Sequence, residues 1–311
     1  MRTWLVLAAV VAVGAAAIGD TLRGTVSADT APAKSPPATA VRRIVPPGVP
    51  SGFMGSVYFS DLRDDCRLHV LRLAGFTDAS PPEYRGCGFS LSPDGKTAAP
   101  AGSAWSPLGG VVAVPGADEF TLESTSGHKV RVEGKSPAFK PDGTLTYLRD
   151  GKLVEWTIRC SAGDRLFTVP GDNATARCIR VVYPHPLRSV AWLAPPRFAA
   201  VTRNGSIILA DGTHLLIHAK LPAHRRATVA VSPQRRFVTI WLDGHLAGTL
   251  DAWGGPVVLP PLENIRALAW SPTERWAMLA TDRGSVYLFR PGTGDARLRR
   301  LDIRAGDVAW R

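Results

Sequence analysis

The four cysteines of this 311-residue chain are the residues whose type and number best allow covalent chemistry: Cys66, Cys87, Cys160 and Cys178. Three disulfide pairings are formally open, and zinc binding is the rival use of such thiols. Spacing favours Cys66–Cys87 and Cys160–Cys178, because each pair then lies within one of the repeats described below. Zinc is disfavoured because no C-x-x-C pair occurs. We expect two disulfide bonds, which are typical of oxidising compartments.

Two histidines four residues apart, His214 and His218, suggest a metal site. However, residues 212–219 have the pattern of a strand, on which positions four apart share a face but lie about 13 Å from each other. No Gly-x-Ser-x-Gly elbow, Walker loop or dinucleotide fingerprint occurs either. We therefore expect no catalytic residue, no metal and no cofactor. The alternative is a hydrolase or lyase whose acidic residues meet at a central channel.

Tryptophan and arginine supply the candidate contact residues, since both are enriched where proteins meet partners. Trp192, Trp270 and Trp310 end apolar runs and are expected to pack inside, whereas Trp241 and Trp253 fall outside that series and flank glycines. The candidate binding surface comprises Trp241, Trp253, Arg225, Arg226, Arg235 and Arg236.

The net charge of +11 and the pI of about 10.0 indicate attraction to polyanions. No RNA-binding or helix-turn-helix signature occurs, so no nucleic acid is expected. We expect a monomer whose partner is a protein or an anionic envelope polymer. If the charge serves binding, the arginines of the later repeats gather on one face; if they only solvate strands, they are spread around the rim. These arginines are Arg225, Arg226, Arg235, Arg236, Arg297, Arg299 and Arg300.

Residues 1–24 are expected to be a signal peptide or a membrane anchor. Arg2 precedes an apolar run at residues 4–18 that is short for a membrane span, which needs ~20 residues, and suits a secretory segment. Residues 25–50 contain six prolines and no apolar periodicity, as in an extended linker. The sequence therefore predicts an extracytoplasmic protein, either secreted or possessing a membrane tether.

The elements that must position these side chains are short strands. Residues 266–291 contain three apolar runs separated by polar turns, the pattern of an antiparallel meander. The residue that follows the first run, Ser271, has counterparts upstream and at the C-terminus: Ser106, Lys140, Ala194, Ser232 and Arg311. Their mean spacing is 41 residues, within the ~40–45 residues of a propeller repeat.

Three segments resemble a known family. The sequences FSLSPDGK at 89–96, FKPDG at 139–143 and AWSP at 269–272 resemble the "WSPDG" signature of TolB-like and WD-repeat-like β-propellers of the exported actinobacterial type. The resemblance implies a fold and no activity. Ser92 and Ser106 both match, but they are only 14 residues apart. We take Ser106 as the anchor of the second blade and assign residues 89–100 to an outer strand or hairpin of the first.

The folded part, residues 51–311, begins in the middle of a repeat, whereas residues 307–311 form a first strand with nothing after it. Joining these ends in the first blade would remove two open sheet edges. The expected fold class is therefore all-β, a six-bladed β-propeller. Its expected function is that of a non-catalytic scaffold that binds a protein or polymer at the cell envelope.

Overall fold

The computed structural model describes residues 55–74, 81–156, 179–221, 226–291 and 298–311. The predicted signal or anchor segment and the linker lie outside the described residues, as do Cys160, Cys178, Arg225 and Arg297. Within these ranges the chain forms 23 strands and no helix. No helix in the described part is therefore long and apolar enough to span a membrane.

The described strands form six antiparallel sheets. Three sheets have four strands each: β5 (Ala104–Trp105), β6 (Val111–Pro115), β7 (Glu119–Ser124) and β8 (Lys129–Glu133); β9 (Lys135–Phe139), β10 (Leu145–Arg149), β11 (Lys152–Trp156) and β12 (Ile179–Tyr183); β13 (Leu187–Trp192), β14 (Arg197–Thr202), β15 (Ser206–Asp211) and β16 (His214–Lys220).

The other three sheets differ in size. One has three strands, β17 (Ala227–Val231), β18 (Phe237–Leu242) and β19 (His245–Asp251), and one has two, β3 (Phe89–Leu91) and β4 (Ala98–Pro100). The largest has six strands in the order β2-β1-β23-β22-β21-β20: β1 (Gly55–Asp61), β2 (Arg67–Ala74), β20 (Ile265–Trp270), β21 (Ala277–Thr281), β22 (Ser285–Phe289) and β23 (Arg299–Trp310).

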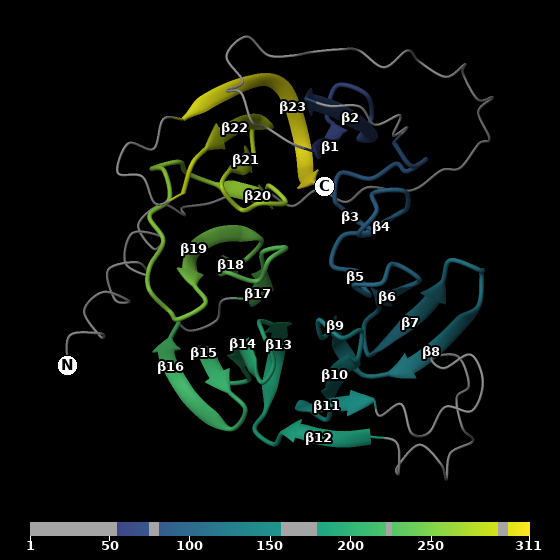
Figure 1. Cartoon of the computed structure of the whole chain (residues 1–311), viewed down its shortest axis with the longest axis vertical. Coiled ribbons are helices and arrows are strands. Elements are labelled where there is room, and N and C mark those ends of the chain that lie inside the picture. The colour runs from purple at the N-terminus through teal and green to yellow at the C-terminus, as the bar shows by residue number, and fades with distance from the viewer. Residues whose placement is uncertain (1–54, 75–80, 157–178, 222–225, 292–297) are drawn as a thin grey trace, which may run out of the picture.

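The sheets stand in a ring, so the fold is a β-propeller, as predicted (Figure 1). Among the described residues, five sheets have the three or more strands of a blade, and the prediction of six blades was wrong. The long strand β23 fuses the last repeat and the first into one sheet. In addition, β3 and β4 form a separate two-stranded sheet instead of an outer part of the first blade.

The C-terminal strand β23 joins the two ends of the described chain. Its first part pairs with β22, where Arg300 lies opposite Tyr287, and its second part pairs with β1, where Trp310 lies opposite Val57. At the chain end, the Ser56 N–H donates to the Arg311 carbonyl at 2.6 Å and the Arg311 N–H donates back at 2.9 Å. The pairing leaves neither β22 nor β1 with an open edge on this side.

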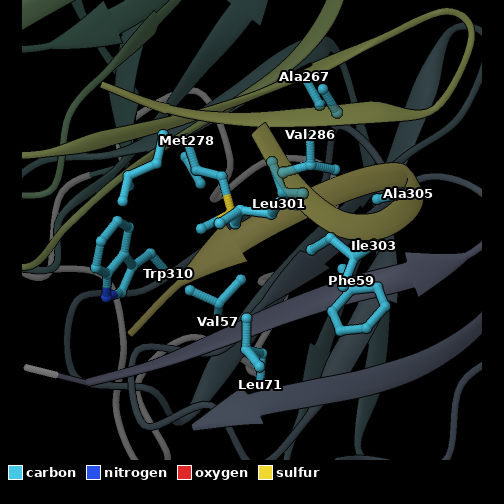
Figure 2. Packing of buried hydrophobic residues seen from close by; sticks show 14 residues of the cluster. Val57, Phe59, Leu71, Ala267, Met278, Val286, Leu301, Ile303, Ala305 and Trp310 are labelled. Carbon is cyan, nitrogen blue, oxygen red and sulfur yellow. The ribbon is translucent and has the colours of Figure 1, made fainter. Parts of the chain in front are cut away.

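The inner strands of this sheet are buried on both faces, which explains why β21 is a nearly continuous apolar run, whereas Arg300, Asp302 and Arg304 of β23 are exposed. Figure 2 shows one face, where Met278 and Ile303 pack with Val57 and Trp310 of the joined ends. Alternate residues of β21 and β22 point the other way and form a second cluster with Trp270. The Trp270 ring stacks on Phe237 of the neighbouring sheet, with 4.5 Å between ring centroids.

One turn recurs between first and second strands and fixes where each first strand ends. At six turns in the described chain, the N–H of the residue after the first strand donates to a carbonyl at or just before the start of the second strand: Ser92, Ser106, Lys140, Leu193, Ser232 and Ser271. Arg311 makes the equivalent bond to Ser56 where the two ends of the described chain meet. Leu193, not Ala194, therefore occupies the repeated position, and Ser92 belongs to the series.

Serine suits this position because its buried hydroxyl accepts a further backbone bond. The N–H groups of Thr97 and Phe237 each donate to the serine five residues before them, at 3.0 Å. The Pro-Asp-Gly residues that follow Ser92 close the turn: Asp94 accepts the Lys96 N–H at 3.1 Å, and Gly95 takes a φ of 72°. These local hydrogen bonds explain why the same residue types recur at this turn.

Candidate binding surface

Cys66 and Cys87 form a disulfide bond with their Cα atoms 4.8 Å apart, which confirms this predicted pairing. The bond ties the segment before β3 to the start of β2. The Gly86 N–H donates to the Cys66 carbonyl at 3.2 Å, and the Ser60 hydroxyl donates to the Cys87 carbonyl at 3.1 Å. The other predicted pairing, Cys160–Cys178, lies outside the described residues.

Asp307 of β23 lies beside this disulfide. Its carboxylate accepts the Phe89 N–H at 3.0 Å and the Val308 N–H at 2.8 Å, while its own N–H donates to the Ser60 hydroxyl at 2.8 Å. Burial raises the pKa of Asp307 to about 6, although both N–H groups and Arg266 favour the charged form. Asp307 therefore joins three segments of the chain, and this role is structural.

The five described arginines of the predicted cluster do not share one site. Arg226 precedes β17 and its N–H donates to Asp243 at 2.8 Å, whereas Arg235 and Arg236 lie at the other end of the β17–β18 hairpin. Arg299 and Arg300 lie on β23.

Arg235 and Arg236 are engaged in contacts between sheets. Arg235 donates from Nη1 to the Trp192 carbonyl at 2.7 Å, and burial lowers the pKa of its guanidinium. Arg236 donates from Nε to Glu274 at 2.9 Å and also contacts the Thr273 carbonyl. These two arginines link neighbouring blades.

A buried ion pair serves a similar role one blade away. Lys140 Nζ lies 2.6 Å from a Glu155 oxygen and 4.8 Å from the centroid of the Trp192 ring. Burial alone would raise the pKa of Glu155, but hydrogen bonds from Lys140 and Arg180 hold it below its ordinary value. The lysine charge is therefore neutralised locally.

The two candidate tryptophans have different environments. Trp241 in β18 is half-buried, and its indole N–H donates to the Thr239 hydroxyl at 3.2 Å. Trp253 follows β19 and is 72% exposed. Of the two, Trp253 offers the larger contact area to a partner.

Hydrogen bonds and close packing fix the loop that carries Trp253. The Asp251 carboxylate accepts the N–H groups of Trp253 and Gly255, each at 2.8 Å. Gly254 has a φ of +88° and lies so close to β16 that an added Cβ would sit 1.6 Å from the Ile217 Cδ1 atom. The exposed indole therefore stands on a rigid base.

A neighbouring blade completes the surface. The Arg197 guanidinium lies over the Trp253 ring, 3.8 Å from its centroid, and its Nε donates to Asp211 at 3.2 Å. Pro195 and Pro196, which precede Arg197, are exposed. We call Trp253, Arg197, Asp211, Pro195 and Pro196 the Trp253 surface. It combines an aromatic face, a fixed cation and exposed apolar groups drawn from two blades.

Sequence reasoning identified Trp253 but missed Arg197 as its partner. The two residues are far apart along the chain, and their stacking depends on how the Gly254 turn packs against Ile217. The exposed Pro195-Pro196 pair next to Arg197 was the available signal of a surface loop.

No three His, Cys, Asp or Glu side chains come together as a metal site within the described ranges. His185, between β12 and β13, and His218 of β16 line one pocket of about 330 Å³ with Tyr183 and Leu215. The His185 ring packs edge-on to Tyr183, with centroids 5.2 Å apart.

No known family and no curated protein matches this sequence. Among solved structures, the chain is similar to hydrazine synthase from Kuenenia stuttgartiensis, with 15% identity over 70% of this chain and 80% of the other, and a TM-score of 0.44. It is also similar to the β-propeller domain of Cps50 (Swd1) from Myceliophteria thermophila, with 14% identity over 84% and 90% of the two chains and a TM-score of 0.43.

Proposed function

We propose that this protein is a non-catalytic β-propeller that binds a protein or an anionic polymer of the cell envelope through the Trp253 surface. The observation that carries the proposal is that Trp253 is 72% exposed yet held on a rigid loop. An exposed aromatic ring contributes little to folding, whereas a pre-organised one loses little entropy when a partner covers it. Arg197, fixed by Asp211 through Nε, adds further guanidinium N–H donors that can orient the partner.

Two features support an extracytoplasmic address. The Cys66–Cys87 disulfide is of the kind that persists in oxidising compartments. The apolar run at residues 4–18, followed by the proline-rich stretch at 25–50, has the composition of an export signal or anchor with a linker. The proposed likeness to exported TolB-like propellers, with a monomeric ring held near the membrane or wall, rests on the same sequence features.

Binding by purified full-length protein tests the function. The protein is mixed with cell-wall fragments, with anionic vesicles or with neutral vesicles, and the retained fraction is measured by co-sedimentation at low and high salt. Protein partners are captured in parallel by cross-linking on intact envelopes. Loss of retention at high salt identifies a charged polymer or lipid surface, because salt screens charges beyond ~8 Å at physiological strength.

Two variants locate the contact. Trp253→Ala removes the exposed ring, and Leu108→Ala, which truncates a side chain that is 85% exposed on another sheet, is the matched control. We expect Trp253→Ala to weaken binding at least about tenfold, since truncating a central tryptophan costs ~2 kcal/mol or more, and Leu108→Ala to bind as the wild type. Equal binding by all three proteins, or no retention on any envelope component, would contradict the proposal.

A further inference from the structure

A groove of about 960 Å³ lies on the six-stranded sheet, away from the Trp253 surface. Residues of three kinds of segment line it: the turn between β1 and β2, the segment before β20, and strands β22 and β23 with the turn that leads into them. Four of the lining residues are arginines: Arg63, Arg283, Arg300 and Arg304.

Three of these arginines have no carboxylate partner among the described residues. Arg300 donates to the Ser285 hydroxyl at 3.4 Å, and Arg304 donates to the Arg283 carbonyl at 3.1 Å, so both guanidiniums are placed by neutral oxygen atoms. In the described part of the chain no carboxylate lies within 4.0 Å of Arg283, Arg300 or Arg304. Their remaining N–H donors are available to an anionic ligand.

The same groove also contains hydrogen-bond acceptors. Three exposed carboxylates line it, Glu263, Asp282 and Asp302, of which Asp282 pairs with His245 and Asp302 lies 3.9 Å from Arg63. Tyr287 lies directly opposite Arg300 in the β22–β23 ladder and contributes a half-buried ring. A ligand seated here would meet guanidinium donors, carboxylate acceptors and an aromatic ring side by side, because Asp302 lies between Arg300 and Arg304 on β23.

This arrangement favours a ligand that carries both an anionic group and hydroxyl groups. Guanidinium groups bind phosphate through paired N–H···O bonds, and a doubly charged phosphate group can pair with several of these cations at once. Carboxylates on the rim would repel a bare polyanion but accept bonds from hydroxyl groups. We propose that the groove binds the phosphate group of a hydroxylated molecule, with a sugar phosphate as the simplest example. This site and the Trp253 surface share no residue, so either proposal can fail alone.

Isothermal titration of the full-length protein at low salt tests the inference with glucose 6-phosphate, inorganic phosphate and glucose as probes. We expect glucose 6-phosphate to bind more tightly than phosphate, and glucose not to bind. Arg283→Gln removes a guanidinium that bonds to no described residue, and Arg300→Gln/Arg304→Gln removes the two on β23. Each change should weaken glucose 6-phosphate at least about tenfold, the usual effect of losing a charged hydrogen bond.

The double variant Arg131→Gln/Lys152→Gln is the control, because it removes two exposed charges from other sheets. It should bind glucose 6-phosphate within about twofold of the wild type, since distant exposed charges are screened. Equal weakening in the control would assign the effect to net charge and overturn the site. Wild-type protein that binds no phosphate compound, or Arg283→Gln protein that binds as the wild type with an unchanged unfolding transition, would also overturn it.

Discussion

The carboxylate of Asp307 accepts the backbone N–H of Phe89 at 3.0 Å, across 218 positions of sequence. Through this bond the C-terminal strand holds the start of β3 as well as β1. Ser60 completes the junction, because its hydroxyl accepts the Asp307 N–H and donates to the Cys87 carbonyl. The junction that the β23–β1 ladder closes thus contains one half-buried acid beside one disulfide.

The titration of Asp307 should make stability depend on pH. Its pKa is about 6 in the folded protein, above the ordinary value of 3.8. A raised folded pKa means that the stabilising contribution of the protonated form is fully present below about pH 4 and is lost as pH rises to about 6. We expect urea unfolding of the wild type to lose at most about 3 kcal/mol across this window from this group.

An asparagine at position 307 does not titrate, so Asp307→Asn should remove this contribution to the pH dependence of the unfolding free energy. The measurement is the difference in unfolding free energy between wild type and variant at pH 4, 5, 6 and 7. A difference that stays constant over the series would show that Asp307 keeps an ordinary pKa.

Deletion of residues 307–311 should destabilise the whole propeller. It removes Trp310, which is 2% exposed, and the Arg311 guanidinium, which donates to the Leu91 and Ser92 carbonyls at 2.9 and 3.1 Å. Loss of the tryptophan alone costs ~3–5 kcal/mol, and β1 becomes an open edge. Calorimetry should show one lower melting transition. An unchanged transition, or fraying confined to β1 by hydrogen exchange, would refute this closure.

Reduction of the Cys66–Cys87 bond should loosen the same junction. Cys66→Ser/Cys87→Ser is expected to lower stability by ~2–4 kcal/mol, because the unfolded chain loses a cross-link between residues 21 apart. Mass spectrometry of unreduced peptides checks both this bond and the predicted Cys160–Cys178 pairing. Four free thiols in protein taken from the native cell envelope would contradict the pairing and the extracytoplasmic proposal together.

Closure by the C-terminus could be predicted because residues 307–311 repeat the pattern of a first strand and lack a second. The number of blades could not be predicted in this way. The sequence indicated a separate strand at 307–311, but Ala305 and Gly306 are small and buried, and they let β23 continue through both repeats. Ser92 was set aside on spacing, although its hydroxyl makes the same turn bonds as Ser232.

The candidate binding surface was predictable only in part. Glycines beside Trp253 marked it as a loop residue, but exposure depends on tertiary packing. Arg235 and Arg236 were read as surface charges, whereas their partners, Trp192 and Glu274, lie about 40 residues away in sequence. The local sequence around an arginine that contacts the next blade is the same as that around an arginine exposed to water, so sequence alone does not separate the two.

Glu274 should be important for joining two blades. Its side chain is fully buried, and it accepts the Gln234 N–H and the Arg236 guanidinium. Glu274→Ala leaves both donors without this acceptor and should cost about 2 kcal/mol. Glu123→Ala, which breaks the exposed pair with Lys129, should cost about 0.5 kcal/mol or less. Urea denaturation of both variants gives the comparison, and equal losses would show that the buried carboxylate has no special role.

Gly254→Ala should disturb the Trp253 surface without touching the indole. The added Cβ would meet Ile217 at 1.6 Å, and the φ of +88° already disfavours any side chain. Gly244→Ala is the matched control, since Gly244 has a φ of +82° but nothing within 4 Å of an added Cβ. Both changes carry the backbone cost of about 1 kcal/mol, so any further loss of stability in Gly254→Ala reports the displacement of the Ile217 side chain alone. Tryptophan fluorescence and envelope binding should shift only in Gly254→Ala. Identical behaviour of the two variants would mean that the packing of Gly254 on β16 does not position Trp253.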